Sequence, residues 1–219
     1  MRVENLTKRY GDVVAVDDVT LDFAPGVHCF AGPNGSGKTT LLRCLAGLTR
    51  PTAGTVDVPG DVNYAFQTPS VYHDLTVADN LAVFAGFADE PREWRATLED
   101  RLGLEPMRDR PASALSDGYR KRLDLALALL DRPRVLVLDE PLADLDPATR
   151  DAIVDTVESY ATDDRYVLAS THNLDRFDGL ADRLTVMSLG RVVADLSRDD
   201  FGSDPGTAYE RALREHGWG

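Results

Sequence analysis

Ten residues near the start of the chain, AGPNGSGKTT (31–40), bring together three glycines, one lysine and two threonines. The phosphate-binding pattern G-x-x-x-x-G-K-S/T is matched by Gly32, Gly37, Lys38 and Thr39. Glycines allow consecutive backbone N–H groups to point inward and phosphate oxygens to approach closely. In such a loop Lys38 supplies a positive charge to the outer phosphates, and Thr39 supplies a hydroxyl ligand to Mg²⁺. The alternative is a flexible turn.

The residues on either side of the glycines favour the phosphate site. VHCFAG (27–32) is short and apolar, which predicts a buried strand that runs straight into the loop. TTLLRCLAGL (39–48) has its leucines at helical spacing and ends near Gly47. The loop is therefore expected between a strand and a helix, where the positive helix N-terminus also attracts phosphate.

A second group of candidate residues lies at the end of VLVLDE (135–140). This continuous apolar run predicts a buried strand that delivers Asp139 and Glu140 at its carboxyl end, where ligands bind in α/β sheets. Asp139 would hold the Mg²⁺ shell, and Glu140 could polarise a water for in-line attack on the terminal phosphate. The alternative interpretation is that both acids are simply solvated at the end of the strand, and the presence of the phosphate loop argues against it.

The rest of the chain supplies further elements for an α/β fold. Residues 76–130 are mostly helical in pattern, and 151–161 form an amphipathic helix. Strands are predicted at 13–23, 62–67 and 165–173, and RLTVMSLGRVVAD (183–195) reads as a hairpin that turns at Gly190. We therefore expect a mostly parallel, covered sheet with an N-terminal antiparallel β portion and a helical insertion.

Composition narrows the class of protein. The chain has 219 residues, enough for one sizeable domain, and it contains no apolar run long enough to span a bilayer. The first ten residues lack the apolar core of a signal peptide. Cys29 and Cys44 offer no disulfide framework or zinc spacing, so they are expected to pack in the core. These features predict a soluble protein of the cytoplasm.

The charge is strongly acidic. A net charge of -13 disfavours nucleic acid as a partner, because nucleic acid attracts basic surfaces. Lys8, Lys38 and Lys121 are the only lysines. An acidic surface with few lysines suits high salt, where screening removes self-repulsion, so we favour a halophilic source. The alternative is an acidic cytosolic protein without adaptation to high salt.

The segment LSDGYRKR (115–122) lies before VLVLDEP across a leucine-rich helix. It resembles the LSGGQ signature of the nucleotide-binding domain of ATP-binding-cassette (ABC) proteins, and further family motifs follow in the expected order. These further matches are Tyr10 for the aromatic that stacks on adenine, Gln67 for the Q-loop glutamine, Asp146 in LADLDP for the D-loop aspartate and His172 for the switch histidine. Each has a weaker interpretation by itself: a strand-end aromatic, a surface glutamine or a packed core histidine.

The resemblance implies one ABC ATPase domain over residues 1–219. It assigns 1–67 and 131–219 to a P-loop NTPase core and 68–130 to a helical subdomain that carries the signature. It implies ATP and Mg²⁺ as cofactors, with Thr39, Gln67 and Asp139 at the metal and Glu140, His172 and Gln67 in catalysis. ATP would contact Tyr10, Gly32, Pro33, Asn34, Gly35, Ser36, Gly37, Lys38, Thr39 and Thr40. Leu115, Ser116, Asp117 and Gly118 would cap ATP bound to a second subunit.

The same resemblance implies partners. Two copies, or this chain and another ABC ATPase, would close head to tail around two ATP molecules and drive a separate integral membrane permease from the cytoplasmic face. SVYHDLTVADNLAVFAG (70–86) resembles the ABC-2 export type at the place where the family contacts its permease. The alternatives are a soluble ABC ATPase that acts on ribosomes or DNA, and a nucleotide-dependent regulator.

Two departures from the family pattern stand out. Asp117 replaces the first glycine of the signature and Tyr119 its glutamine, and a carboxylate near a triphosphate repels it unless it points away. Ala143 and Asp144 replace the usual D-loop serine and small apolar residue. The second departure bears on communication between the two sites.

Overall fold

The computed structural model describes residues 1–86, 92–162, 164–171, 174, 177, 179–202 and 204–215. Its strands are β1 (Arg2–Tyr10), β2 (Val13–Asp22), β3 (Gly26–Ala31), β4 (Ala53–Asp57), β5 (Val62–Ala65), β6 (Val135–Asp139), β7 (Tyr166–Ser170), β8 (Arg183–Ser188) and β9 (Arg191–Ser197). Its helices are α1 (Lys38–Leu45), α2 (Val77–Ala85), α3 (Arg92–Arg101), α4 (Asp117–Leu129), α5 (Pro147–Tyr160), α6 (Arg198–Phe201) and α7 (Pro205–Glu215), with 3-10 turns at Glu105–Met107 and Ala112–Ala114.

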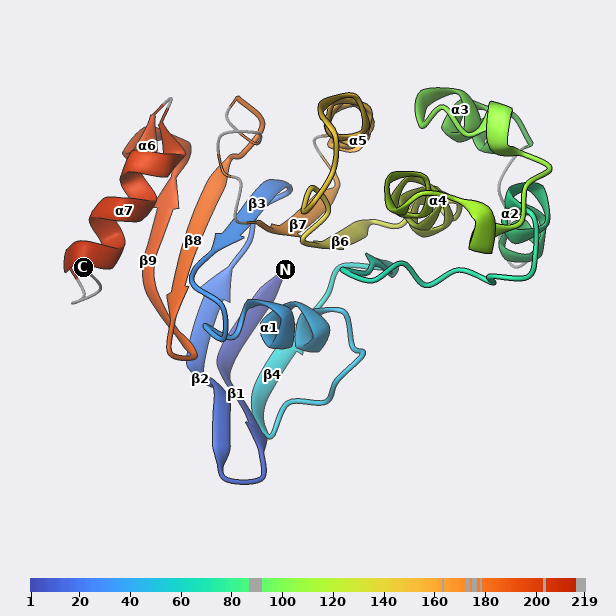
Figure 1. The fold of residues 1–219 in the computed structure, drawn as a ribbon. Helices are drawn as coiled ribbons and strands as arrows, with labels where there is room; N and C mark the ends of the chain where they lie inside the picture. The colour runs from blue at the N-terminus through green and yellow to red at the C-terminus, as the bar shows by residue number, and fades with distance from the viewer. Residues whose placement is uncertain are drawn as a thin grey trace.

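The strands form two sheets, shown together in Figure 1. The larger sheet has the order β5-β6-β7-β3-β8-β9, and every neighbouring pair is parallel except the β8–β9 hairpin. The smaller sheet is antiparallel, with the order β2-β1-β4. This is the predicted α/β class: a mostly parallel sheet with an antiparallel N-terminal portion.

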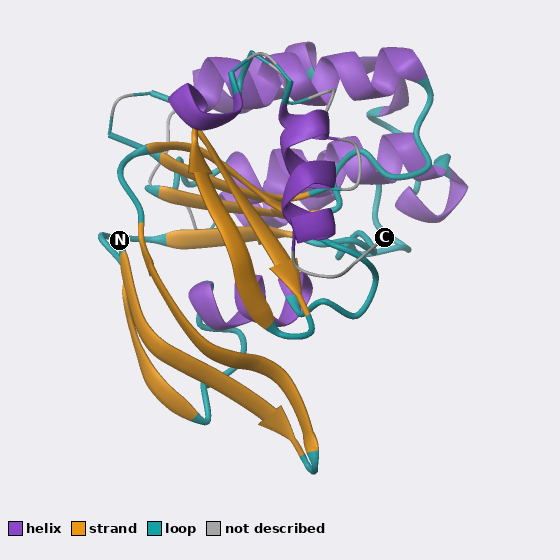
Figure 2. Cartoon of the chain, turned by 90° about the vertical axis from the view of Figure 1, so that its left-hand side faces the viewer, coloured by secondary structure: helices purple, strands orange, loops and turns teal. Residues whose placement is uncertain are grey.

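The central strands of the larger sheet lie between two hydrophobic cores, because alternate side chains of a strand point to opposite faces of the sheet. On β6, Leu136 and Leu138 belong to the core shared with α4, α5 and α7, whereas Val135 and Val137 belong to the other core. That second core contains the buried leucines of α1 and apolar residues of β1 and β2. Helix α1 therefore lies between the two sheets, and the three-stranded sheet extends away from the rest of the fold (Figure 2).

Helices α2, α3 and α4 lie together at one end of the larger sheet, beyond β5 and β6 (Figure 1). Both α2 and α3 pack against α4, and their buried leucines, such as Leu81 and Leu98, join the core under the sheet. The helices occupy the region where the sequence pattern predicts a helical insertion. The predicted subdomain boundaries at 67/68 and 130/131 stay a prediction.

Sequence patterns did not indicate every element. Strands β1 and β4 were not predicted, although β1 is the central strand of the smaller sheet. The predicted hairpin at Gly190 is present, and both Leu189 and Gly190 have positive φ, at 48° and 81°. The C-terminal part holds two helices, α6 and α7.

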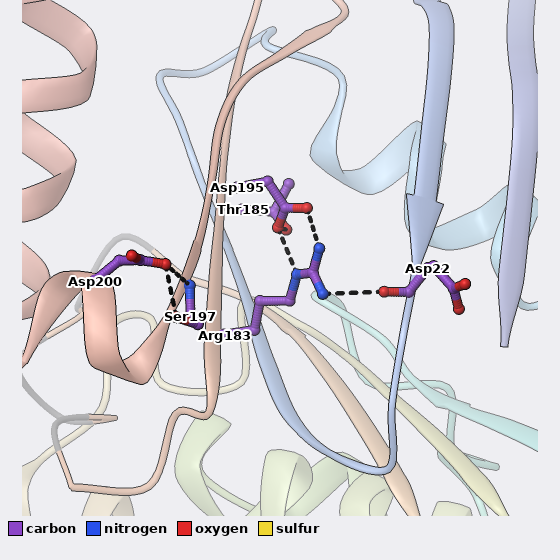
Figure 3. A network of polar contacts seen from close by, with 6 residues as sticks. All are labelled: Asp22, Arg183, Thr185, Asp195, Ser197 and Asp200. Carbon is purple, nitrogen blue, oxygen red and sulfur yellow. Dashed lines mark hydrogen bonds and ion pairs between the residues drawn. The ribbon is translucent and has the colours of Figure 1, made fainter.

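A polar network joins the two sheets near the end of β2 (Figure 3). Arg183 of β8 forms an ion pair with Asp195 of β9 and donates to the carbonyl oxygen of Asp22 at 3.0 Å. Thr185 Oγ1 donates to the same Asp195 carboxylate at 3.0 Å. This network thus links the hairpin to the antiparallel sheet.

Two expectations from composition can be compared with the structure. Cys29 and Cys44 are both buried free thiols, as predicted from their number and spacing. Among the described residues, no helix has both the length and the apolar character needed to cross a membrane.

Candidate nucleotide-binding site

The glycine-rich loop connects β3 to α1, the strand-loop-helix context that its sequence predicts. Its backbone leaves no room for side chains at two points. A Cβ atom on Gly32 would lie 2.3 Å from the carbonyl oxygen of Met187, and one on Gly37 would lie 2.4 Å from that of Ala15. Gly37 has a φ of 103°, which only glycine adopts without strain, and it precedes the first residue of α1. The glycines therefore fix the loop close to β2 and β8.

Lys38 lies inside this loop. Its side chain is nearly buried, and Nζ donates to the carbonyl oxygen of Gly32 at 2.7 Å. Burial lowers the pKa of Lys38, and the nearby charges of Glu140 and Asp139 oppose this shift. The ammonium is therefore held between the glycine loop and the two carboxylates that the sequence predicts beside a phosphate.

Asp139 is the last residue of the fully buried strand β6, and its carboxylate accepts hydrogen bonds from three hydroxyl groups. Thr39 Oγ1 donates to Oδ1 at 3.0 Å, Ser170 Oγ donates to Oδ1 at 2.8 Å, and Tyr64 Oη donates to Oδ2 at 2.9 Å. The structure thus brings Thr39 and Asp139 together as predicted. Ser170 and Tyr64 were not predicted, because only the strand order places them beside Asp139.

The pair Thr39 and Asp139 fits a magnesium ion by its chemistry. Mg²⁺ takes oxygen ligands and usually keeps one or two protein ligands, with water and phosphate oxygens for the rest. A threonine hydroxyl and a carboxylate oxygen 3.0 Å apart, next to a phosphate loop, offer such a donor set. No cluster of three or more histidine, cysteine or acidic side chains suited to a metal occurs in the described part of the chain.

Glu140 follows Asp139 in a tight turn with a φ of 50°, an unusual value for a residue with a side chain. Its backbone N–H donates to Ser170 Oγ at 2.8 Å, so Ser170 holds both acidic residues through one hydroxyl. Glu140 and Gln67 line a cavity of about 400 Å³ together with residues 34–40 and 13–15. Two of the predicted catalytic residues, Glu140 and Gln67, therefore share one cavity with residues 34–40 of the phosphate loop.

Tyr10 lies at the end of β1, where it pairs with Val13 of β2. The ring is 50% exposed, and the Lys8 ammonium is 4.9 Å from its centroid. Val13 lines the cavity described above, so Tyr10 lies at the hairpin beside its rim. A flat, exposed ring next to the phosphate loop is compatible with the predicted stacking on a base. His172, the predicted switch histidine, lies outside the described residues.

The signature residues 115–118 lie at the start of α4. Ser116 is the N-cap, and its side chain accepts from the Tyr119 N–H. Asp117 forms an ion pair with Arg120, and 83% of its side chain is exposed. The carboxylate that departs from the family pattern is therefore balanced by a neighbouring cation one helical turn away. Other segments line the cavity around Lys38.

Two polar residues stabilise the loops after β6. Asp146 is the N-cap of α5 and accepts from Thr149 Oγ1 at 2.6 Å and from the Thr149 N–H at 3.0 Å, and these two bonds lower its pKa. Lys121 of α4 donates from Nζ to the carbonyl oxygens of Glu140, at 3.1 Å, and Ala143, at 3.0 Å. This role of Lys121 was not predicted, because the two carbonyls are about twenty residues away along the chain.

The profile of the family described as "ABC transporter" matches residues 16–143, from β2 through the phosphate loop, the signature and Asp139–Glu140. The chain belongs to the ABC transporter family. It is an ATP-binding subunit of this family and an ATPase, as the phosphate loop and the carboxylate pair predict.

Curated relatives of this ABC ATPase cover nearly the whole chain. The Nod factor export ATP-binding protein I of Ralstonia nicotianae is 36% identical over 89% of the chain, and the match spans 66% of the relative. The daunorubicin resistance ATP-binding protein DrrA3 of Streptomyces coeruleorubidus is 37% identical over 98% of the chain and 74% of its own length. A phosphonates import ATP-binding protein of Natronomonas pharaonis is 36% identical over 92% of the chain and 97% of its own length.

The fold of this ABC ATPase is shared with solved structures. One, described as the ATP binding subunit of an ABC transporter, superposes with a TM-score of 0.85 at 23% identity and covers 98% of both chains. The arrangement of two sheets and a helical group is therefore that of a cassette ATPase.

Proposed function

We propose that two copies of this ABC ATPase close head to tail around two Mg-ATP molecules and power a separate membrane permease. One observation carries the proposal. The phosphate loop, Asp139 and Glu140 line or adjoin a single cavity, while the signature residues 115–118 stand at a helix N-terminus outside it. A complete site therefore needs the signature of another subunit.

Within one subunit the roles follow from position. Lys38 and the loop N–H groups bind the outer phosphates, and Thr39 and Asp139 hold Mg²⁺, which neutralises phosphate charge when bound. Glu140 accepts the proton of the attacking water, since it faces the same cavity from the end of β6. Gln67 reaches the cavity from the loop after β5 and is assigned to the metal and the water.

Across the dimer, the N-terminus of α4 presents Ser116, Gly118 and the positive end of the helix to the partner's terminal phosphate. Asp117 does not oppose this contact, because its charge is paired with Arg120. Hydrolysis removes the phosphate that holds the two subunits together, and the dimer opens.

The partner is proposed to be an integral membrane permease of the ABC-2 export type, bound at the cytoplasmic face of the membrane. The contact surface consists of residues 70–85, where Tyr72 is 54% exposed and Val83 is 38% exposed. The fully buried Asn80 fixes this segment, because its side chain bonds both the N–H and the carbonyl oxygen of Tyr72. The relatives include proteins named for export and one named for import, so the direction of transport has to be measured with the permease.

The dimer is tested by Glu140→Gln. Glutamine keeps the size of the side chain but cannot accept a proton, so ATP hydrolysis should fall by at least about 100-fold. Loss of a negative charge that faces ATP should also favour closure. Light scattering with saturating ATP should therefore show a dimer for this variant and a monomer without nucleotide.

A second substitution locates the signature in the dimer contact. Ser116→Arg added to Glu140→Gln should abolish the ATP-dependent dimer. Ser113→Arg is the matched control, because Ser113 is also exposed and lies three residues before Ser116, outside the motif. A Glu140→Gln variant that stays monomeric in ATP, or a Ser116→Arg variant that still dimerises, contradicts the proposed closure.

The transport role is tested by co-purification from the native membrane. A hydrophobic integral membrane subunit that co-purifies with the chain supports the proposal. Recovery with ribosomes instead would favour the alternative, a soluble ABC ATPase that does not transport.

A further inference from the structure

Helix α4 holds the Q-loop, defined here as residues 66–70, through one buried carboxylate. Asp124 Oδ2 accepts from the Phe66 N–H at 2.8 Å, and Asp124 Oδ1 accepts from the Ser70 N–H at 2.8 Å. The two amides flank Gln67, Thr68 and Pro69. One side chain therefore fixes both ends of the loop that carries Gln67.

The chemistry of the contact requires a carboxylate. The loop leaves β5 after Ala65, so its N–H groups lose their strand partners, and a buried N–H without an acceptor is unfavourable. Asp124 is 5% exposed, and an ionised carboxylate accepts at both oxygens without offering a donor. Burial raises the pKa of Asp124 to about 6, so the carboxylate is mostly ionised at neutral pH.

The same helix contacts the other parts of the site. It begins at the signature, where Ser116 caps it. One turn before Asp124, Lys121 donates to the carbonyl oxygens of Glu140 and Ala143, and one turn after it, the Ala128 carbonyl accepts from Asn63 Nδ2 at 2.9 Å. A single rigid element thus connects the signature, the turn that carries Glu140 and the Q-loop.

We propose that Asp124 is a positioning residue, which clamps the Q-loop to the signature helix and thereby sets the place of Gln67 in the ATP site. When the signature of α4 engages the partner's ATP, movement of the helix carries Gln67 of its own subunit with it. The kinetic part of this inference rests on the proposed function, whereas the clamp itself does not.

The variant Asp124→Asn separates the clamp from simple packing. Asparagine has nearly the same size, but its NH₂ group faces one of the two amides and cannot accept from it. We expect kcat for ATP hydrolysis to fall about tenfold, which corresponds to the loss of roughly one hydrogen bond in the transition state. The ATP dissociation constant should stay within about twofold of the wild-type value. An unchanged kcat in the folded variant overturns the proposal.

Glu99→Gln is the matched control. Glu99 is a nearly buried carboxylate of the same helical group, but it pairs with Arg95 on α3 and makes no contact with the Q-loop in the described residues. Its kcat should stay within about twofold of wild type. An equal loss of kcat in both variants shows a general packing effect and overturns the proposal.

A double-mutant cycle tests whether Asp124 acts through Gln67. In a Gln67→Ala background, Asp124→Asn should lower kcat by less than about twofold, because the group that it positions is already missing. Independent, multiplicative losses overturn the positioning role.

Amide hydrogen exchange gives a readout that does not need ATPase activity. In the wild-type chain the Phe66 and Ser70 amides should be protected, and at least one should exchange about tenfold faster in Asp124→Asn. Exchange of both amides at unprotected rates in the wild type overturns the clamp. A wild-type chain without ATPase activity but with protected amides instead rejects the proposed function and leaves the clamp supported.

Discussion

Replacement of Ser170 by alanine should destabilise the fold and the active site together. The Ser170 hydroxyl is fully buried, accepts from the Glu140 N–H at 2.8 Å and donates to Asp139 Oδ1 at 2.8 Å. Alanine leaves a buried amide without an acceptor, which costs about 1–3 kcal/mol, and removes a bond to a charged group of similar strength. We therefore expect the free energy of unfolding to fall by about 3 kcal/mol.

Thermal unfolding and steady-state ATPase kinetics measure the effect. For a chain of this size the melting temperature should fall by roughly 6 to 12 °C. The kcat should fall by at least about tenfold, because the turn at Glu140, with its φ of 50°, loses the bond that fixes it.

Ser188→Ala is the matched control. Ser188 is also buried at the carboxyl end of a strand of the same sheet, β8, but its hydroxyl has no hydrogen-bond partner among the described residues. Its removal should change stability by less than about 0.5 kcal/mol or raise it slightly. If Ser170→Ala and Ser188→Ala unfold at the same temperature, the two bonds of Ser170 contribute nothing and the reasoning is refuted.

Three further outcomes follow from charge and burial. Lys38→Ala should weaken ATP binding by at least about tenfold in calorimetry, and unchanged affinity would reject the phosphate loop assignment. Burial raises the pKa of Asp124 to about 6. Between about pH 4 and 6, Asp124 is therefore protonated in the native protein, whereas the unfolded chain has already released this proton. Its contribution to unfolding free energy should therefore fall with rising pH across this window, by about 3 kcal/mol, and denaturant titrations of Asp124→Asn should lack this slope. The net charge of -13 predicts a melting temperature that rises from low to molar KCl, where the screening length falls to about 3 Å, and a flat or falling profile would reject a halophilic origin.

The chemistry of the site could be predicted largely from the sequence because its main motifs are local. The phosphate loop places glycines, Lys38 and Thr39 within eight residues, and an apolar strand followed by two acids predicts where Asp139 and Glu140 lie. The strand-loop-helix context of the phosphate loop was likewise readable from short-range patterns, and the structure has it. Strands β1 and β4 were not predicted. The register of β1 shifts in its pairing with β2 and also with β4, so polar and apolar residues do not alternate regularly along it.

The family, the phosphate-binding loop and the identity of the two carboxylates can thus be read from short sequence motifs, because each motif consists of residues adjacent in the chain. The contacts that hold these residues in place depend on the fold. Ser170 reaches Asp139 across 31 residues, Tyr64 across 75, and Asp124 reaches Phe66 across 58. Such contacts depend on which strands lie side by side and on how α4 packs against β5. A residue pattern with a period of two or 3.6 predicts which face of an element is buried, but it does not predict which element packs against that face.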